Sequence, residues 1–156
     1  MSSKLAMELY KAAVLTFENL GFMFPTQELD ENQQNASVEA AVSVKFQGPF
    51  SGMLVVTIYG DLLPTIAANM LGEEKAPSEQ QQHDALGEIA NVICGNMLPG
   101  IAGPKEVFHV GAPQMVRSAN LKVGDAESPI AEVQVGLYQG RADLLLFLDS
   151  NAAQHL

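Results

Sequence analysis

Residues 37–59 read SVEAAVSVKFQGPFSGMLVVTIY, and this pattern predicts two paired β-strands. Apolar and polar residues alternate between 37 and 47, which is typical of a strand with one buried and one exposed face. Gly48-Pro49 interrupts the alternation, and residues 50–59 form a second, more continuously apolar strand. Two strands separated by so short a break predict an antiparallel hairpin.

Helices are expected on both sides of this hairpin. Residues 4–20 carry apolar side chains at helical spacing, and Gly21 is placed to end that helix. Residues 25–36 are rich in Pro, Asp and Asn and predict a polar loop. After the hairpin, Asp61 is placed to cap a short helix reaching about residue 71, with Pro64 tolerated in its first turn.

A longer helix follows a linker over residues 72–77. Ser78 and Gln81 form a capping-box pattern, which predicts a helix from about residue 79 to 98. Pro99-Gly100 is expected to stop it.

The last third of the chain predicts short strands over residues 107–110, 115–123, 133–137 and 142–148. A helix, a hairpin, two helices and then several strands predict an α+β fold, and not an alternating doubly wound one. We expect one domain over residues 1–156, an antiparallel sheet sandwich with long helices packed on it.

Composition excludes several classes of partner. The 156 residues include 18 acidic and 8 basic side chains, for a formal net charge of −10. Nucleic acid and anionic membranes bind through Lys and Arg, so neither is an expected partner.

No signal peptide is recognisable, and no run approaches the roughly 18 apolar residues of a membrane helix. Cys94 is the only cysteine, which fits a reducing compartment, and we expect a soluble, cytoplasmic protein.

The long helix separates apolar from polar residues. One stripe is apolar and should pack on the sheet: Leu86, Ile89, Ala90, Ile93 and Met97. The opposite face presents Asp84, Glu88 and Asn91, and Gly95 continues it. Glu88 and Asn91 are three residues apart, so a carboxylate and an amide project side by side.

The simplest interpretation of this polar face is a helix surface exposed to water, since most polar helical residues face solvent. However, Gly87 and Gly95 each cost about 1 kcal/mol relative to Ala in a helix interior. A helix that accepts both requires a closely approachable surface, either for its own packing or for a partner.

Residues 88–96, EIANVICGN, resemble the E-x-x-N-x-x-x-G-N signature of the CheC/CheX/FliY chemotaxis phosphatases, and residues 84–87 are similar to CheX-type sequences. CheC-type proteins carry two such motifs, but the first helix here reads Glu18-Asn19 and has no E-x-x-N. The single motif therefore resembles CheX, whose members form homodimers.

This resemblance implies a phosphatase that accelerates hydrolysis of the aspartyl phosphate on a CheY-like response-regulator receiver domain. Asn91 would position the attacking water, and Glu88 would pair with a lysine of the receiver. Mg²⁺ would be held by the partner receiver, so no cofactor or metal of the chain's own is expected. Gly95 would either let the receiver approach or only help the helix pack, and Asn96 is expected to tie the helix end.

Two alternatives remain. Flagellar switch proteins of the FliM type share the fold but lack the catalytic pair, so a non-catalytic interaction module is one alternative. A CheX-like protein that binds a phosphorylated receiver without hydrolysing it is the other.

Outside the motif's two polar residues, Cys94 is expected to be a buried, inert thiol, and the three histidines show no metal-ligand spacing.

Overall fold

A computed structural model gives the fold, and it describes all residues except 1, 73–74, 117–127, 150–151 and 153–156. The elements in chain order are α1 (Ser2–Asn19), β1 (Pro25–Thr26), α2 (Glu31–Gln34), β2 (Val38–Gln47), β3 (Ser51–Tyr59), α3 (Leu63–Leu71), α4 (Glu79–Ala102), β4 (His109–Val110), β5 (Gln114–Val116), β6 (Ala131–Leu137) and β7 (Gly140–Leu148). The predicted strand over 115–123 is therefore present to Val116, and the rest of it lies outside the described residues.

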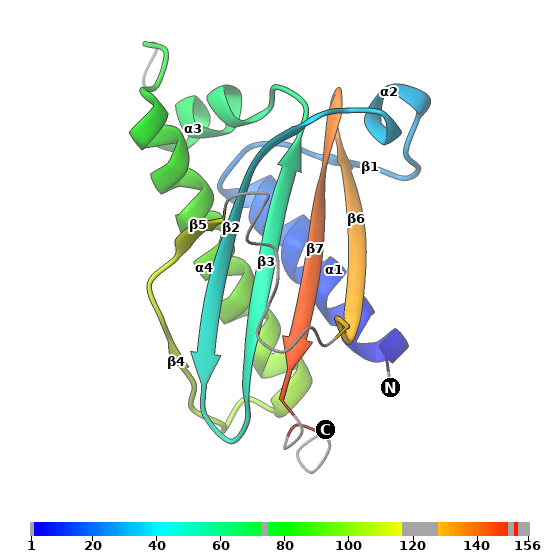
Figure 1. Ribbon diagram of the computed structural model, residues 1–156, viewed down its shortest axis with the longest axis vertical. Coiled ribbons are helices and arrows are strands. Elements are labelled where there is room, and N and C mark those ends of the chain that lie inside the picture. The colour runs from blue at the N-terminus through cyan, green and yellow to red at the C-terminus, as the bar shows by residue number, and fades with distance from the viewer. Residues whose placement is uncertain (1, 73–74, 117–127, 150–151, 153–156) are drawn as a thin grey trace.

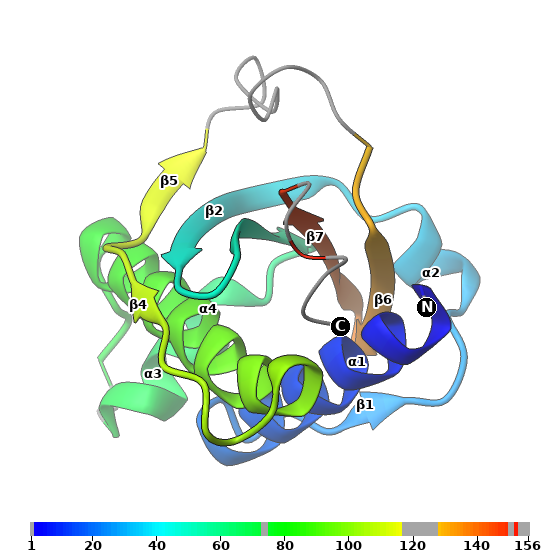
Figure 2. The ribbon, with the colours of Figure 1, turned by 90° about the horizontal axis from the view of Figure 1, so that it is seen from below.

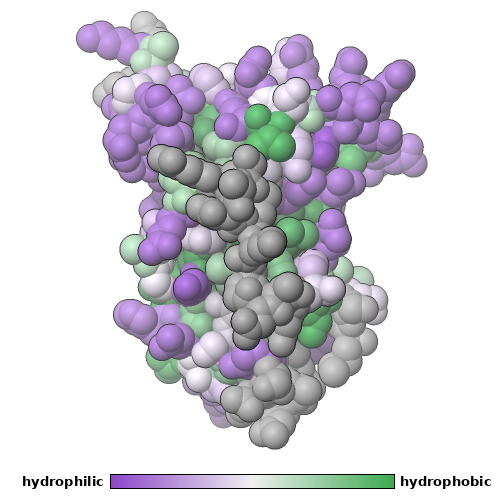
Figure 3. Space-filling view, viewed as in Figure 1, coloured by the Kyte–Doolittle hydropathy of each residue, from purple (hydrophilic) through white to green (hydrophobic). Residues whose placement is uncertain are grey.

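The strands form one antiparallel sheet in the order β1-β6-β7-β3-β2-β4, and β5 also pairs with β2. The two long helices, α1 and α4, lie side by side against one face of this sheet (Figures 1 and 2). Hydrophilic side chains gather at the corner formed by α2 and at the corner where α4 begins (Figure 3). The expected α+β class, an antiparallel sheet with long helices packed on it, is confirmed.

The predicted hairpin is formed by β2 and β3. Val42 pairs with Val56, and Val44 pairs with Leu54, so apolar residues meet across the strands on the face that the helices cover. Val38, at the start of β2, is 57% exposed because the strand register shifts between Val38 and Ala40.

The core lies between the sheet and the pair α1–α4. Every member of the predicted α4 stripe is fully buried, namely Leu86, Ile89, Ala90, Ile93 and Met97. By length and composition α4 is long and apolar enough to span a membrane, contrary to the expectation from the sequence, but 56% of its apolar stretch is buried inside the protein. A buried core helix can have the same length and composition, and the packing of α4 on the sheet and on α1 accounts for its apolar character.

The expectation that Pro99 stops α4 is wrong. The helix continues to Ala102, and Gly103 ends it at φ +96°. A proline inside a helix costs about 3 kcal/mol through the lost backbone donor. Here the added turn, residues 99–102, buries Ile101, which is 4% exposed, and this burial offsets part of the loss.

The expected Asp61 cap of α3 is also wrong, although Pro64 does lie in the first turn. The cap comes from another element: Glu39 Oε1, on β2, accepts hydrogen bonds from the backbone N–H groups of Leu62 at 2.9 Å and Leu63 at 3.1 Å. Burial raises the pKa of the Glu39 carboxyl above its ordinary value, while these two hydrogen bonds oppose that rise.

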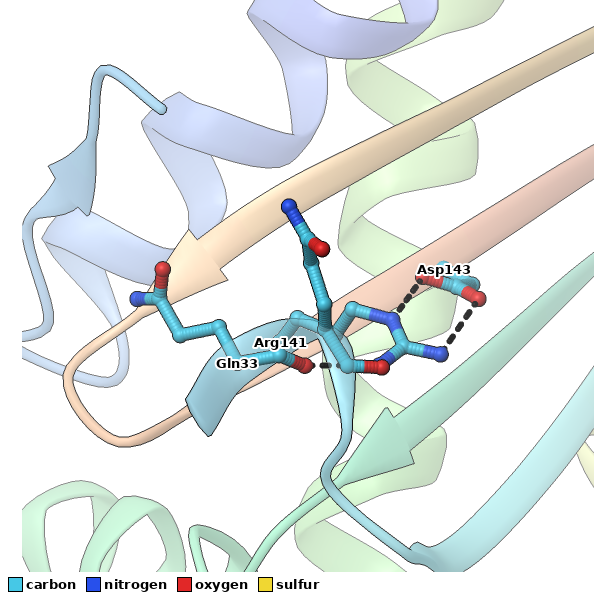
Figure 4. Close-up of polar contacts among 4 residues, drawn as sticks. Gln33, Arg141 and Asp143 are labelled. Carbon is cyan, nitrogen blue, oxygen red and sulfur yellow. Dashed lines mark hydrogen bonds and ion pairs between the residues drawn. The ribbon is translucent and has the colours of Figure 1, made fainter. Parts of the chain in front are cut away.

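Residues 25–36 are not simply a polar loop, because they contain β1 and the short helix α2. Asp30 and Gln33 close a capping box at the start of α2. Arg141 of β7 anchors the end of α2, because its Nη1 donates to the carbonyl oxygens of Gln33 at 2.7 Å and Gln34 at 2.9 Å. Its Nε donates to Asp143 at 2.9 Å (Figure 4), so a strand far along the chain fixes this segment.

The ends of α1 and of β6 use bulky residues in the left-handed region. Gly21 donates to the carbonyl oxygen of Phe17, but the residue with positive φ after α1 is Phe22, at +52°. In the turn between β6 and β7 the corresponding residue is Tyr138, at +53°. Such conformations cost roughly 1–3 kcal/mol for residues other than glycine.

Candidate functional site

Glu88 and Asn91 both lie on the side of α4 that faces away from the core. The Glu88 side chain is exposed, and Asn91 is half-buried. Together they line a groove of about 390 Å³, which we call the α4 groove. Its other lining residues are Val42, Gln80, His83, Asp84, Gly87, Pro113 and Met115.

The second wall of the groove is a segment in which the sequence predicts short strands but no functional role. Residues 109–116, here called the strap, run along the outer edge of β2 through β4 and β5. Gly111 N donates to Lys45 O at 2.8 Å within this pairing. Pro113 and Met115 of the strap face α4 across the groove. A loop proline and a short strand carried no signal of a functional wall, since only the folded chain brings them to α4.

The two glycines of the α4 face have different roles. A β-carbon at Gly87 would lie 3.1 Å from Pro113 Cβ and 3.2 Å from its Cγ, which is tighter than ordinary contact. A β-carbon at Gly95 would meet no other atom within 4 Å, and Gly95 is exposed. Gly87 therefore serves the packing of the strap on α4. Gly95 serves no packing inside the described chain and leaves a bare surface one turn beyond Asn91.

The Asn91 amide has an unused acceptor. Its Oδ1 is buried and has no hydrogen-bond partner, and it is the one such side-chain atom found among the buried groups that the structure describes. A buried polar atom without a partner costs roughly 1–3 kcal/mol. An unsatisfied group of this kind in a native fold calls for an explanation, and a role in binding or catalysis is one.

Glu88 is likewise uncommitted. Within the described residues its carboxylate takes part in no hydrogen bond or ion pair. The neighbouring polar groups are occupied with each other: Gln80 Nε2 donates to Asp84 Oδ1 at 2.8 Å, and His83 Nε2 lies 3.8 Å from Glu79 Oε1. An exposed carboxylate on a stiff helix is free to meet a cation of another molecule.

Two further residues of the motif have structural roles. Asn96 Nδ2 donates to Thr16 Oγ1 at 3.3 Å, and the same hydroxyl donates to Ala12 O at 2.7 Å. Asn96 thus has the structural role that was expected, but it ties α4 to α1 and does not cap the end of its own helix. Cys94 is buried, and burial raises its pKa to about 12. The thiol stays protonated near neutral pH and is no nucleophile.

The chemistry that Glu88 and Asn91 offer in the groove is positioning. No group of three or more His, Cys, Asp or Glu side chains among the described residues is placed to hold a metal ion. An amide and a carboxylate can orient a water and pair with a cation, but neither is set up here to form a covalent intermediate.

Comparisons with known proteins identify the family and the fold. The family model described as "Chemotaxis phosphatase CheX" matches residues 40–134, which include most of the hairpin and all of α4 and the strap. The chain matches no curated protein.

Solved structures of the same fold come from several bacteria. A chemotaxis protein CheX from Desulfovibrio desulfuricans superposes with a TM-score of 0.71 at 16% identity, over 93% of this chain and 99% of that one. A CheC-like superfamily protein from a Shewanella species gives 0.69 at 16% identity, over 96% and 100%. The CheX–CheY–BeF₃–Mg²⁺ complex from Borrelia burgdorferi gives 0.59 at 15% identity, over 92% and 97%.

Proposed function

Because the chain belongs to the CheX family of chemotaxis phosphatases, we propose that it accelerates hydrolysis of the aspartyl phosphate on a CheY-like receiver domain. Glu88 and Asn91 would enter the receiver's active site from the α4 groove. A cytoplasmic homodimer, as the resemblance implies, is part of the same proposal.

The observation that carries the proposal is the unpaired Oδ1 of Asn91. The torsion between Cβ and Cγ of asparagine is soft, so the amide turns at low cost when nothing holds it. No hydrogen bond inside the described chain would be lost by such a turn, and the oxygen would gain one from a water. The amide is thus free to accept from the attacking water while its nitrogen donates to a phosphoryl oxygen.

Glu88 has a separate task in this mechanism. By the family resemblance, the receiver holds a lysine and Mg²⁺ beside its phosphoryl group, so it supplies most of the charge stabilisation. The free Glu88 carboxylate would pair with that lysine and fix the register in which Asn91 enters. A general base is not required, because the nucleophile is set up by its position.

The rate acceleration that the proposal requires of Asn91 is modest. A hundredfold acceleration corresponds to about 2.7 kcal/mol of barrier lowering. One positioned group that replaces the random approach of water by a fixed one is able to supply that amount. The bare surface at Gly95 supports the proposal, since it leaves room for the receiver next to Asn91.

Incubation with a phosphorylated receiver tests the function and separates it from the two alternatives. Repeated turnover, with phosphate released from an excess of phosphorylated receiver, is the expected result. Protection of the phosphate would identify a non-catalytic reader, and no effect on the receivers of the same organism would favour a flagellar-switch-type module.

A further inference from the structure

A second pocket lies away from the α4 groove, where α1 ends and the turn between β6 and β7 begins. Its volume is about 480 Å³, and its lining residues come from three stretches of the chain, 22–26, 61–69 and 138–139. Three aromatic side chains border it and are largely exposed: Phe22 by 63%, Phe24 by 71% and Tyr138 by 72%. We call it the aromatic pocket. Single exposed apolar residues are ordinary, but three large rings around one hollow mark a binding surface.

The backbone holds two of these rings at a conformational cost. Phe22 and Tyr138 are the two residues other than glycine with positive φ among those the structure describes. Each has a glycine close by, and that glycine is needed for close packing. A β-carbon at Gly21 would lie 3.1 Å from Phe17 O, and one at Gly140 would collide with Tyr59 O. At these two positions glycine would adopt the positive φ at the lowest conformational energy, yet the chain carries an aromatic residue. This points to a function for the ring.

The charge around the aromatic pocket is negative. Asp61 lines it, is exposed, and takes part in no hydrogen bond or ion pair within the described residues. Neither Lys, Arg nor His is among the lining residues. The carboxyl end of the 18-residue helix α1 reaches the same place and has no basic residue in its last turn. The N–H groups that begin α3 are already bound by Glu39, so they offer no compensating positive charge.

Aromatic rings around a hollow with one free carboxylate are suited to an organic cation, because ring faces attract a positive charge and exclude water from it. We propose that the aromatic pocket binds a small organic cation, an ammonium group carried on a short apolar body. The rings of Phe22, Phe24 and Tyr138 would surround the methylated nitrogen, and Asp61 would neutralise it. The pocket volume is in the range of small-molecule sites, about 300–1,000 Å³. This site is independent of the phosphatase proposal.

Choline and its neutral isostere 3,3-dimethyl-1-butanol form a matched pair of probes, since they differ mainly in charge. We expect choline to shift the backbone amide resonances around residues 22, 61 and 138 in a saturable way on the full chain. The alcohol should bind at least about fivefold more weakly, the factor that a single exposed cation–ring contact supplies. Equal affinity for the two probes, or no saturable shift with choline, would overturn the proposal.

The variants Tyr138→Gly and Phe22→Gly keep the experiment independent of folding. Each removes one ring and at the same time relaxes a left-handed backbone, so the melting temperature should hold or rise while choline affinity falls at least about fivefold. Asp61→Asn should also weaken choline but leave the alcohol unchanged. Asn91→Ala, in the α4 groove, should bind choline as the parent chain does. Full affinity in both glycine variants, or tighter binding of a lysine-rich peptide than of choline, would refute a small-cation site.

Discussion

Gly87 of α4 lies directly against Pro113 of the strap, so that a β-carbon on the glycine would be 3.1 Å from the proline ring. Both residues line the α4 groove together with Glu88 and Asn91. Gly95, two turns further along the same helix face, has no such neighbour. The two glycines are therefore matched positions, one packed from within the chain and one open.

Alanine at these two positions should give opposite effects on stability. Gly95→Ala should raise the free energy of unfolding by up to about 1 kcal/mol, because it improves helix propensity and contacts nothing. Gly87→Ala must push Pro113 away from α4, so it should gain nothing or lose stability. Urea denaturation of both variants measures the difference. Equal stabilisation at both positions would show that the strap does not rest on Gly87.

A larger side chain at Gly95 tests the proposed docking surface. Gly95→Leu should fold at least as stably as the parent chain, since the site is open, yet lose phosphatase activity towards a phosphorylated receiver by blocking its approach. Steady-state hydrolysis with increasing receiver should show the loss mainly as a higher KM. Undiminished activity in Gly95→Leu would place the receiver elsewhere on the surface.

Asn91→Ala should separate activity from stability. Activity should fall by about a hundredfold or more, which corresponds to about 2.7 kcal/mol in the barrier. Stability should not fall, because the substitution removes a buried oxygen that has no partner and adds a better helix former. Asn96→Ala is the matched control: it breaks the hydrogen bond to Thr16 and should lower stability while sparing catalysis. The reverse pattern would exchange the roles assigned to the two residues.

Glu88→Lys should weaken docking to the phosphorylated receiver, since a lysine would face the receiver's own lysine. The affinity, followed by titration against the receiver, should drop by about tenfold or more and should recover partly at high salt as the repulsion is screened. Asp84→Lys, one turn away on the same face, makes an equal change in net charge. A loss of the same size in Asp84→Lys would show a general charge effect in place of a specific pair.

Much of this fold could be predicted from the sequence wherever the partners are close along the chain. The hairpin, the Ser78–Gln81 capping box and the buried stripe of α4 all depend on local spacing, and all are confirmed. The failures share a cause: Glu39 caps α3 from a strand 23 residues earlier, and Arg141 anchors α2 from 108 residues away. The expectation that Pro99 ends α4 failed for a related reason: the helix continues past the proline and buries Ile101 in the core.

The same distinction holds for the candidate site: the placement of residues within one helix could be predicted, and contacts between distant segments could not. The side-by-side placement of Glu88 and Asn91 followed from helical spacing, because it needs only one element. The strap could not be foreseen, because Pro113 reaches Gly87 only after β4 and β5 pair with β2. The glycine in the helix was the sole local hint that another segment comes close there.

Arg141 should be essential for holding α2 on the sheet. Its guanidinium binds two carbonyl oxygens and Asp143, and it lies 3.7 Å from the centroid of the Tyr59 ring. Arg141→Met would leave those carbonyls and a carboxylate unpaired, and we expect a loss of about 2–4 kcal/mol in unfolding free energy. Hydrogen exchange should report faster opening of residues 30–37 in particular. Arg141→Lys keeps the charge without the planar fork and should recover only part of the loss.

Glu39 should make stability depend on pH. Its pKa in the folded protein is raised above the ordinary 4.5, mainly by burial, so the folded state holds this proton more tightly than the unfolded chain. The resulting stabilisation is complete below about pH 4.5, the unfolded value, and is lost as the pH rises through the higher folded value. Glu39→Gln keeps an acceptor for Leu63 N but cannot ionise. Relative to Glu39→Gln, the parent chain should therefore become less stable between pH 4 and 7, as measured by urea denaturation at each pH. A parent chain that gains on the variant over this interval would mean that the hydrogen bonds from Leu62 and Leu63 outweigh the effect of burial.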